Sequence, residues 1–303
     1  MLTLFCSPAL ASQPFPTTVS AQRPAGVPSD YVVTPFGYMH PSCVMGIDAN
    51  ESVQGALIQR TDGSTRPIVP CTHPRFGGGP SAPGGPPPTI NNWVEWGDNA
   101  SFGPIDFLVG WWTVPNGPGT ADGQTIYMFN GLEPSDGSFI LQPVLAWDGW
   151  NDNRYTMTDW RCCVNGTALH DNPLTISAVG EQIEGYVEGF NCGGSGVCST
   201  WAVGYSCSDG SGAFFTDSQG KVLDWMFGGA LEVYDVWECP ALPFDQPSEQ
   251  GVVFSNTFAQ TTSGTYIHPT WSHEFGQTTN PSCSFGISGP QNALSLNWNG
   301  NYP

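Results

Sequence analysis

The chain is short of basic side chains. It has seven Lys and Arg residues against 26 Asp and Glu, which gives a formal net charge of -19 at pH 7. So few cations cannot neutralise the phosphates of a nucleic acid or the headgroups of an anionic membrane, and both are excluded as partners. A chain with few basic groups also gains little repulsive positive charge when its carboxylates are protonated. The charge balance therefore favours solubility and is compatible with acid conditions.

Long apolar runs and helical patterns are scarce as well. No stretch reaches the roughly 18 apolar residues that indicate a membrane span. Windows rich in Ala, Glu, Lys, Leu and Arg with a helical period are absent, whereas 38 Gly and 28 Pro indicate many turns. Short apolar runs alternate with turns such as PNGPGTADG and CSDGSG. This pattern predicts an all-β fold, a two-sheet antiparallel β-sandwich of the jelly-roll or concanavalin-like kind with a small N-terminal β module.

Changes of composition divide the chain into segments. An apolar start ends in small residues, as a secretory signal peptide does, and a Gly- and Pro-rich linker follows the N-terminal module. The predicted segments are a signal-peptide remnant at 1–11, a disordered lead at 12–30, a disulfide-stapled β module at 31–75, the linker at 76–90 and the sandwich domain at 91–303. The module is either a propeptide that blocks a cleft until acid releases it or a permanent appendage.

Ten cysteines in a weakly charged chain indicate an oxidising compartment, so we expect a secreted, extracellular protein. Cys43 and Cys71 bracket the N-terminal module and are predicted to bond, which would staple a small core. Cys239 and Cys283 are predicted to join a late strand to the C-terminal segment.

The remaining cysteines are less constrained. We expect Cys162 and Cys163 not to pair with each other, so that each seeks one of three partners: Cys192, Cys198 or Cys207. Removal of a leader would also remove Cys6 and leave an odd number of cysteines, hence one free or interchain thiol.

Two predicted strands carry a polar side chain in otherwise apolar surroundings. Gln142 lies in SFILQPVL and Glu232 lies in ALEVYDVWEC. A buried polar side chain in a strand costs free energy unless something satisfies it. A Gln and a Glu that face one cleft are one solution. The alternatives are a solvent-exposed strand position for Glu232 and a polar edge position for Gln142.

The order of motifs carries a resemblance. IYMFNGL is followed by Ile140-Leu141-Gln142, by GEQI at 180–183 and by the strand with Glu232, and this set, over roughly residues 100 to 260, resembles the glutamic peptidase (eqolisin) superfamily. The resemblance implies that Glu232 is a general base and then a general acid, and that Gln142 donates to the oxyanion. It implies a peptide or protein substrate, no cofactor and no metal.

The resemblance also suggests the substrate-binding residues. The Trp that lines the family's cleft falls at Ile126 or Tyr127 here, depending on register, and the family's Asp in that strand is Asn130. We predict that Tyr127, Asn130, Trp150 and Trp160 bind substrate. Because of these departures, two forms of the hypothesis stay open: a divergent endopeptidase, or a relative that kept the fold without the chemistry.

Other classes of function are weaker. A non-catalytic sandwich that binds a glycan on its Trp-rich face is one alternative, and an extracellular protein that self-assembles through strand edges is another. His268, His273 and Glu274 do not have the H-E-x-x-H spacing of a zinc site. No G-x-S-x-G motif supports a serine hydrolase.

Overall fold

The computed structural model describes residues 23–24, 26–77, 90–121, 123–150, 153–236, 238–243, 251–276 and 283–298. The predicted leader, most of the predicted lead and most of the predicted linker lie outside these residues. Within them the chain consists of strands and turns, with two short 3-10 turns, η1 (Pro41–Cys43) and η2 (Cys239–Ala241). None of the helices in the described part is long and apolar enough to cross a membrane.

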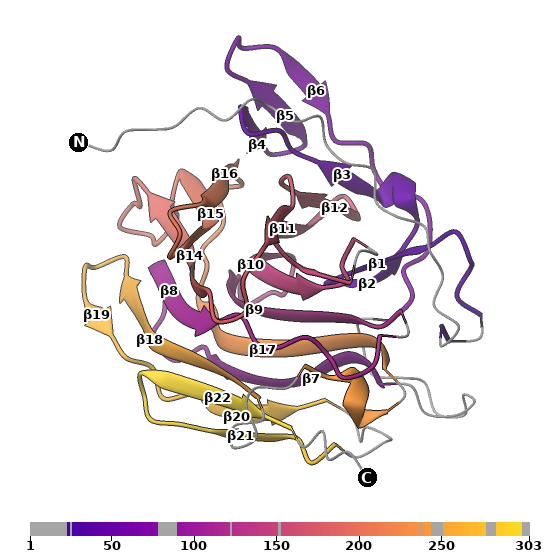
Figure 1. Cartoon of the computed structure of the whole chain (residues 1–303). Coiled ribbons are helices and arrows are strands. Elements are labelled where there is room, and N and C mark those ends of the chain that lie inside the picture. The colour runs from indigo at the N-terminus through magenta and orange to yellow at the C-terminus, as the bar shows by residue number, and fades with distance from the viewer. Residues whose placement is uncertain are drawn as a thin grey trace.

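Two large sheets form a sandwich, as the sequence predicts (Figure 1). In spatial order, the nine-stranded sheet contains β20 (Ser272–Phe275), β7 (Ile90–Asn99), β17 (Trp225–Val236), β9 (Thr125–Glu133), β10 (Ile140–Trp147), β11 (Tyr155–Val164), β12 (Thr167–His170) and β3 (Val44–Gly46), with β13 (Leu174–Ile176) also on β11. The eleven-stranded sheet contains β21 (Gly286–Ser288), β22 (Ala293–Asn297), β18 (Gly251–Thr261), β8 (Ile105–Thr113), β14 (Gln182–Phe190), β15 (Thr200–Cys207), β16 (Gly212–Ser218), β4 (Glu51–Gln54), β5 (Leu57–Arg60) and β6 (Thr65–Pro67), with β19 (Tyr266–Ile267) on β18. A separate pair is formed by β1 (Val32–Thr34) and β2 (Gly37–Met39).

The central strands of the nine-stranded sheet are buried on both faces. They are nearly continuous apolar runs, whereas β14 of the other sheet alternates between buried and partly exposed positions. Continuous apolar runs are what a strand covered on both sides requires. One face packs in the main core between the sheets, where Ile126 and Met128 lie. The other face carries Tyr127 and Phe129 and forms a second core with residues of the N-terminal segment.

The N-terminal segment is attached to both sheets. β3 pairs in parallel with β12, and β4 pairs in parallel with β16, while all the other strand pairs within the described residues are antiparallel. Figure 1 shows β3 to β6 rising at one end of the sandwich and β1 and β2 beside β9 and β10. The segment therefore extends the sandwich as well as covering part of it.

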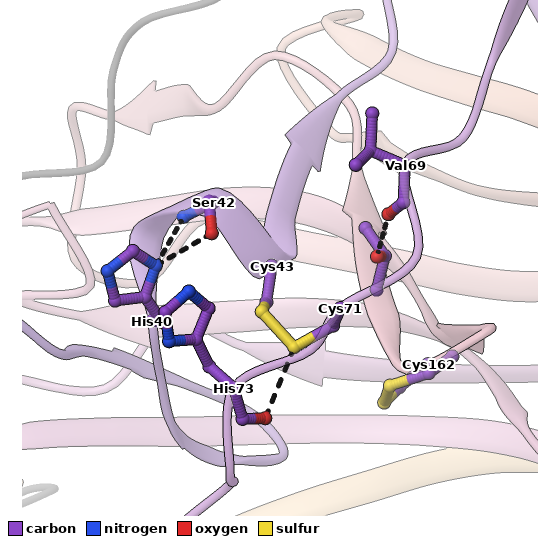
Figure 2. The surroundings of a disulfide bond; sticks show 9 residues. His40, Ser42, Cys43, Val69, Cys71, His73 and Cys162 are labelled. Carbon is purple, nitrogen blue, oxygen red and sulfur yellow. Dashed lines mark hydrogen bonds between the residues drawn. A yellow bond between two sulfur atoms is a disulfide. The ribbon is translucent and has the colours of Figure 1, made fainter.

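A disulfide closes a loop within this segment, and hydrogen bonds hold the segment against β12. Cys43 is bonded to Cys71, and Figure 2 shows this bond beside the stacked rings of His40 and His73. The Thr167 hydroxyl donates to the Val69 carbonyl at 2.5 Å, and the Cys71 amide donates to the Asn165 carbonyl at 3.1 Å. The stretch that carries Cys71 is therefore held against β12.

Elsewhere Cys239 is bonded to Cys283 and Cys192 to Cys198. The expectation that Cys162 and Cys163 avoid each other is wrong. They form a disulfide with each other, and the peptide bond between them is cis. Cys207 is the free cysteine of the described part, and it is buried.

Charged side chains lie inside the sandwich. The Arg161 guanidinium of β11 pairs with the Asp217 carboxylate of β16 at 3.1 Å, and both are almost fully buried. Nearby, the Asp159 amide donates to the Asp171 carboxylate at 2.8 Å. Burial raises the pKa of Asp171 to about 7 and raises the pKa of Asp159 well above its usual value, where Asp171 adds to the effect. These carboxyls favour the neutral form in the folded protein.

Candidate active site

Glu232, Gln142 and Tyr127 lie on the same face of the nine-stranded sheet. Residues that pair across neighbouring strands share a face, and so do residues two apart on one strand. Glu232 of β17 pairs with Tyr127 of β9, which pairs with Ala146 of β10. Gln142, four residues before Ala146, is opposite Trp160 of β11. This face, covered by the N-terminal segment, is the candidate site.

Glu232 is completely buried. The Tyr234 hydroxyl donates a hydrogen bond to its Oε1, while Oε2 has no partner among the described residues. Burial raises the pKa of Glu232 well above its usual value, and the bond from Tyr234 and the charge of Arg75 partly oppose that rise. The carboxyl is thus held through one oxygen, and the other oxygen is buried without a hydrogen-bond partner among the described residues.

Gln142 is also completely buried, and neither its amide nitrogen nor its amide oxygen has a partner among the described residues. Gln142 lies on β10, two strands away from Glu232 on β17. Along the strands, it lies two rows of cross-strand pairs on this face away from the row that contains Glu232, and the row between them contains Phe129 and Val144. Standard strand spacings separate the two Cα atoms by about 13 Å along the strands and about 10 Å across them. In this covered form the two side chains are too far apart to hold one water between them.

Tyr127 is the residue directly opposite Glu232. Its hydroxyl donates to the backbone carbonyl of Val33, on the covering strand β1, at 3.1 Å. Of the two sequence candidates for the cleft position, Ile126 points into the main core and Tyr127 points to the covered face. Burial raises the pKa of Tyr127 well above its usual value, and the nearby Glu232 adds to the effect.

Trp160 and Trp150 lie at one end of the same face, where His170 is between them. The His170 ring contacts Trp150 at 5.3 Å and Trp160 at 5.0 Å between ring centres. Trp160 is only 2% exposed, because the Phe36 ring of the N-terminal segment packs edge-on against it at 5.8 Å. Burial lowers the pKa of His170 to about 4, so this ring is neutral at mildly acidic and neutral pH.

Asn130, the remaining residue predicted to bind substrate, lies on the opposite face of β9. Its side chain points into the sandwich, where its amide nitrogen donates to the Gly185 carbonyl of the other sheet at 2.9 Å. Side chains alternate along β9, so a residue three positions from Tyr127 faces the opposite side. Asn130 joins the two sheets and does not face the covered site.

The cover itself consists of β1, β2 and the turn between them. Tyr38 of β2 donates its hydroxyl to the Asp235 carboxylate at 2.5 Å, and its ring packs against Tyr234 at 5.2 Å. Tyr234, Asp235 and Tyr38 were not among the sequence candidates. The position of Tyr234, two residues after Glu232 on one strand, was the available signal for the first of them.

The described residues contain no group of three or more His, Cys, Asp and Glu side chains arranged to hold a metal ion. No protein-family model matches the chain, and no curated protein sequence matches it either.

Solved structures do resemble it. A crystal structure of scytalido-glutamic peptidase with a peptide-based transition-state analogue matches with a TM-score of 0.52 and 13% identity, over 68% of this chain and 98% of that chain. SCP-B, a member of the eqolisin family, in complex with the tripeptide Ala-Ile-His, gives 0.49 and 13%, over 68% and 98%. A second scytalido-glutamic peptidase structure, with a transition-state analogue inhibitor, gives 0.47 and 14%, over 69% and 98%. The chain therefore has an all-β sandwich fold like that of scytalido-glutamic peptidase.

Proposed function

We propose that the chain is a secreted, acid-active endopeptidase of the glutamic-peptidase type, with Glu232 as its acid–base group. The observation that carries the proposal is the state of this carboxyl. On the face of a sandwich that resembles a peptidase, it is buried, held through Oε1 by Tyr234 and unpaired at Oε2. A fixed carboxyl with one free oxygen is the arrangement that general acid–base catalysis needs.

Glu232 would act in two steps. Its carboxylate removes a proton from water through Oε2 as the water attacks the peptide carbonyl, and the protonated acid then gives a proton to the leaving amine. The covered form disfavours the carboxylate because burial raises the pKa of Glu232. Departure of the cover would readmit solvent, lower that pKa and supply the carboxylate under acid conditions.

Gln142 is the second residue of the proposed site. The resemblance assigns its amide to the oxyanion, yet its register position is far from Glu232. An extended peptide rises about 3.3 Å per residue, so a segment of about five residues would reach from one side chain to the other. We therefore propose that the unpaired Gln142 amide binds the substrate backbone, together with the aromatic surface of Trp160 and Trp150.

The N-terminal segment supports the propeptide form of the hypothesis over a permanent appendage. Its β1–β2 turn lies on the site residues themselves, through Val33 on Tyr127, Phe36 on Trp160 and Tyr38 on Asp235. A substrate could not reach Glu232 while these contacts exist. We propose that the structure represents a latent state that is opened at acid pH or by a cut in residues 78–89.

Glycan binding is less well supported than hydrolysis. Trp160 is nearly inaccessible and Trp150 packs on His170, so these two rings form no exposed aromatic platform for a sugar. Glycan binding by the uncovered protein and self-assembly stay predictions.

The test is cleavage of a peptide library by the full chain from about pH 2 to 8, a range that brackets carboxyl titration. Wild type is compared with Glu232→Gln and with Glu274→Gln, which changes an exposed carboxylate on β20. We expect an acidic optimum that only Glu232→Gln abolishes. Equal cleavage by Glu232→Gln, or none by folded wild type at any pH even after a cut in residues 78–89, would contradict the proposal.

A further inference from the structure

A backbone carbonyl already lies at the candidate site. Strand β1 is extended, and the Val33 carbonyl oxygen accepts the hydrogen bond from the Tyr127 hydroxyl at 3.1 Å. Tyr127 and Glu232 form a cross-strand pair, so their Cβ atoms are about 5 Å apart. A peptide carbonyl is therefore hydrogen-bonded to the phenol of the residue that pairs with Glu232.

We infer that Tyr127 is a further catalytic residue of the proposed reaction: its hydroxyl donates to the carbonyl oxygen of the scissile bond and to the oxyanion that forms there. The inference rests on the proposed function. In the covered form the Val33 carbonyl takes the place of the substrate carbonyl, so β1 shows how an extended peptide is held.

The reaction balances without any other group. Water oxygen bonds to the carbonyl carbon while Glu232 takes one water proton, and the carbonyl π electrons move onto oxygen as an oxyanion that accepts from Tyr127. The oxyanion then re-forms the carbonyl, the C–N bond breaks, and the amine leaves with the proton from Glu232. Tyr127 keeps its own proton throughout, because the ordinary pKa of a phenol, about 10, lies far above acid pH.

The geometry favours Tyr127 over Gln142 for this role. A donor to an oxyanion has to lie within about 3 Å of the oxygen, and the attacking water has to lie within reach of Glu232. Tyr127 is in the same pairing row as Glu232, whereas Gln142 is two rows away, beyond Phe129. One scissile carbonyl beside Glu232 can therefore be reached by Tyr127 and cannot be reached by Gln142.

The experiment measures steady-state kinetics of acid-incubated full chain on a fluorogenic peptide taken from the library. Tyr127→Phe keeps the ring and removes the donor. Tyr155→Phe is the matched control, since it removes a phenol that donates to the Asn116 carbonyl at 3.0 Å, away from the covered face. We expect Tyr127→Phe to lower kcat by about 10²- to 10³-fold with KM nearly unchanged. Tyr155→Phe should retain wild-type kcat, and Gln142→Ala should mainly raise KM.

Two results would overturn the inference alone: a Tyr127→Phe kcat within threefold of wild type, or a loss of kcat in Gln142→Ala that Tyr127→Phe does not share. Both require active wild type and inactive Glu232→Gln, so they leave the proposed function intact. A wild type that cleaves nothing defeats the proposed function first, and the inference with it. If Tyr127→Phe does not fold, 3-fluorotyrosine at this position alters donor strength with the fold preserved, and an unchanged kcat would equally overturn the inference.

Discussion

Tyr234 donates a hydrogen bond to the carboxyl of Glu232, two residues earlier on strand β17. Residues two apart on a strand point to the same face, so this contact is a direct product of the local sequence E-V-Y. The bond restricts rotation of the Glu232 carboxyl and occupies one oxygen only. It also favours the charged form of the acid, against the effect of burial.

Replacing Tyr234 with Phe should therefore raise the pKa of Glu232. The base form would then appear only at higher pH, so the acid limb of the pH profile of kcat should move to higher pH. Loss of a hydrogen bond to a buried acceptor should also destabilise the protein by about 1–3 kcal/mol. The measurement is kcat against pH, together with urea unfolding. A destabilised variant whose acid limb stays in place would show that Tyr234 has a structural role only.

Phe36→Ala should weaken the cover. The Phe36 ring is 7% exposed and packs on Trp160, and a buried Phe→Ala change costs about 3–5 kcal/mol where the site cannot collapse. We expect faster hydrogen exchange in β1 and β2 and a shorter lag before peptide cleavage after acidification. Phe275→Ala, at a position 51% exposed on β20, is the control and should change neither. Faster hydrogen exchange with an unchanged lag would mean that local opening of β1 and β2 does not determine activation.

Removal of the Cys43–Cys71 bond should destabilise the chain more than removal of Cys192–Cys198. The first bond joins cysteines 28 positions apart in the sequence, and the second joins cysteines 6 positions apart. The chain-entropy relation gives about 3.5 kcal/mol for the longer loop and about 2 kcal/mol for the shorter one. Equilibrium unfolding of the two double Cys→Ala variants measures the difference. The opposite order would mean that contacts of the N-terminal segment, rather than loop closure, determine its stability.

The fold followed from patterns that each strand carries by itself. Alternation, Gly-rich turns and the absence of helical periods predict the sandwich, and the apolar runs of β9, β10 and β17 agree with burial on both faces. The arrangement of the site residues depended on the pairing register between neighbouring strands. The alternation of side chains within one strand does not show which residues of two neighbouring strands are paired. In addition, β17 shifts register against β9 between Phe227 and Ala230. Hence the separation of Gln142 from Glu232 was invisible in the sequence. Alternation along β9 does show that Tyr127 and Asn130, three residues apart, face opposite sides, but it does not show which of the two faces inward.

The cover could not be predicted for a related reason. Residues 31–39 contact β9, β11 and β17, far along the chain, and nothing in YVVTPFGYM encodes those partners. The sequence analysis expected Cys162 and Cys163 not to pair with each other, whereas the structure joins them in a disulfide.

Thermal stability should be greater at mildly acidic pH than at pH 8. Burial raises the pKa of Asp171 and of Glu133 to about 7 and that of Glu95 to about 9. An acid whose folded pKa is raised contributes stability that is complete below its unfolded pKa, near 4, and is lost as the pH rises through the folded value. His170 acts in the opposite direction, because its pKa of about 4 removes stability as the pH falls from about 6.5 towards 4.

The carboxyls with a raised pKa outnumber the one histidine with a lowered pKa, so Tm should be at least about 3 °C higher at pH 5 than at pH 8. A shift of this size corresponds to roughly 1 kcal/mol of stability in a domain of this size. Asp171→Asn should flatten this dependence, since its amide keeps an acceptor for the Asp159 backbone and no longer ionises. Glu274→Gln, at an exposed position, should leave it unchanged. Calorimetry at both pH values makes the comparison. A Tm that is equal at the two pH values, or higher at pH 8, would show that these carboxyls gain enough solvent or hydrogen bonds in the folded protein to ionise at little cost.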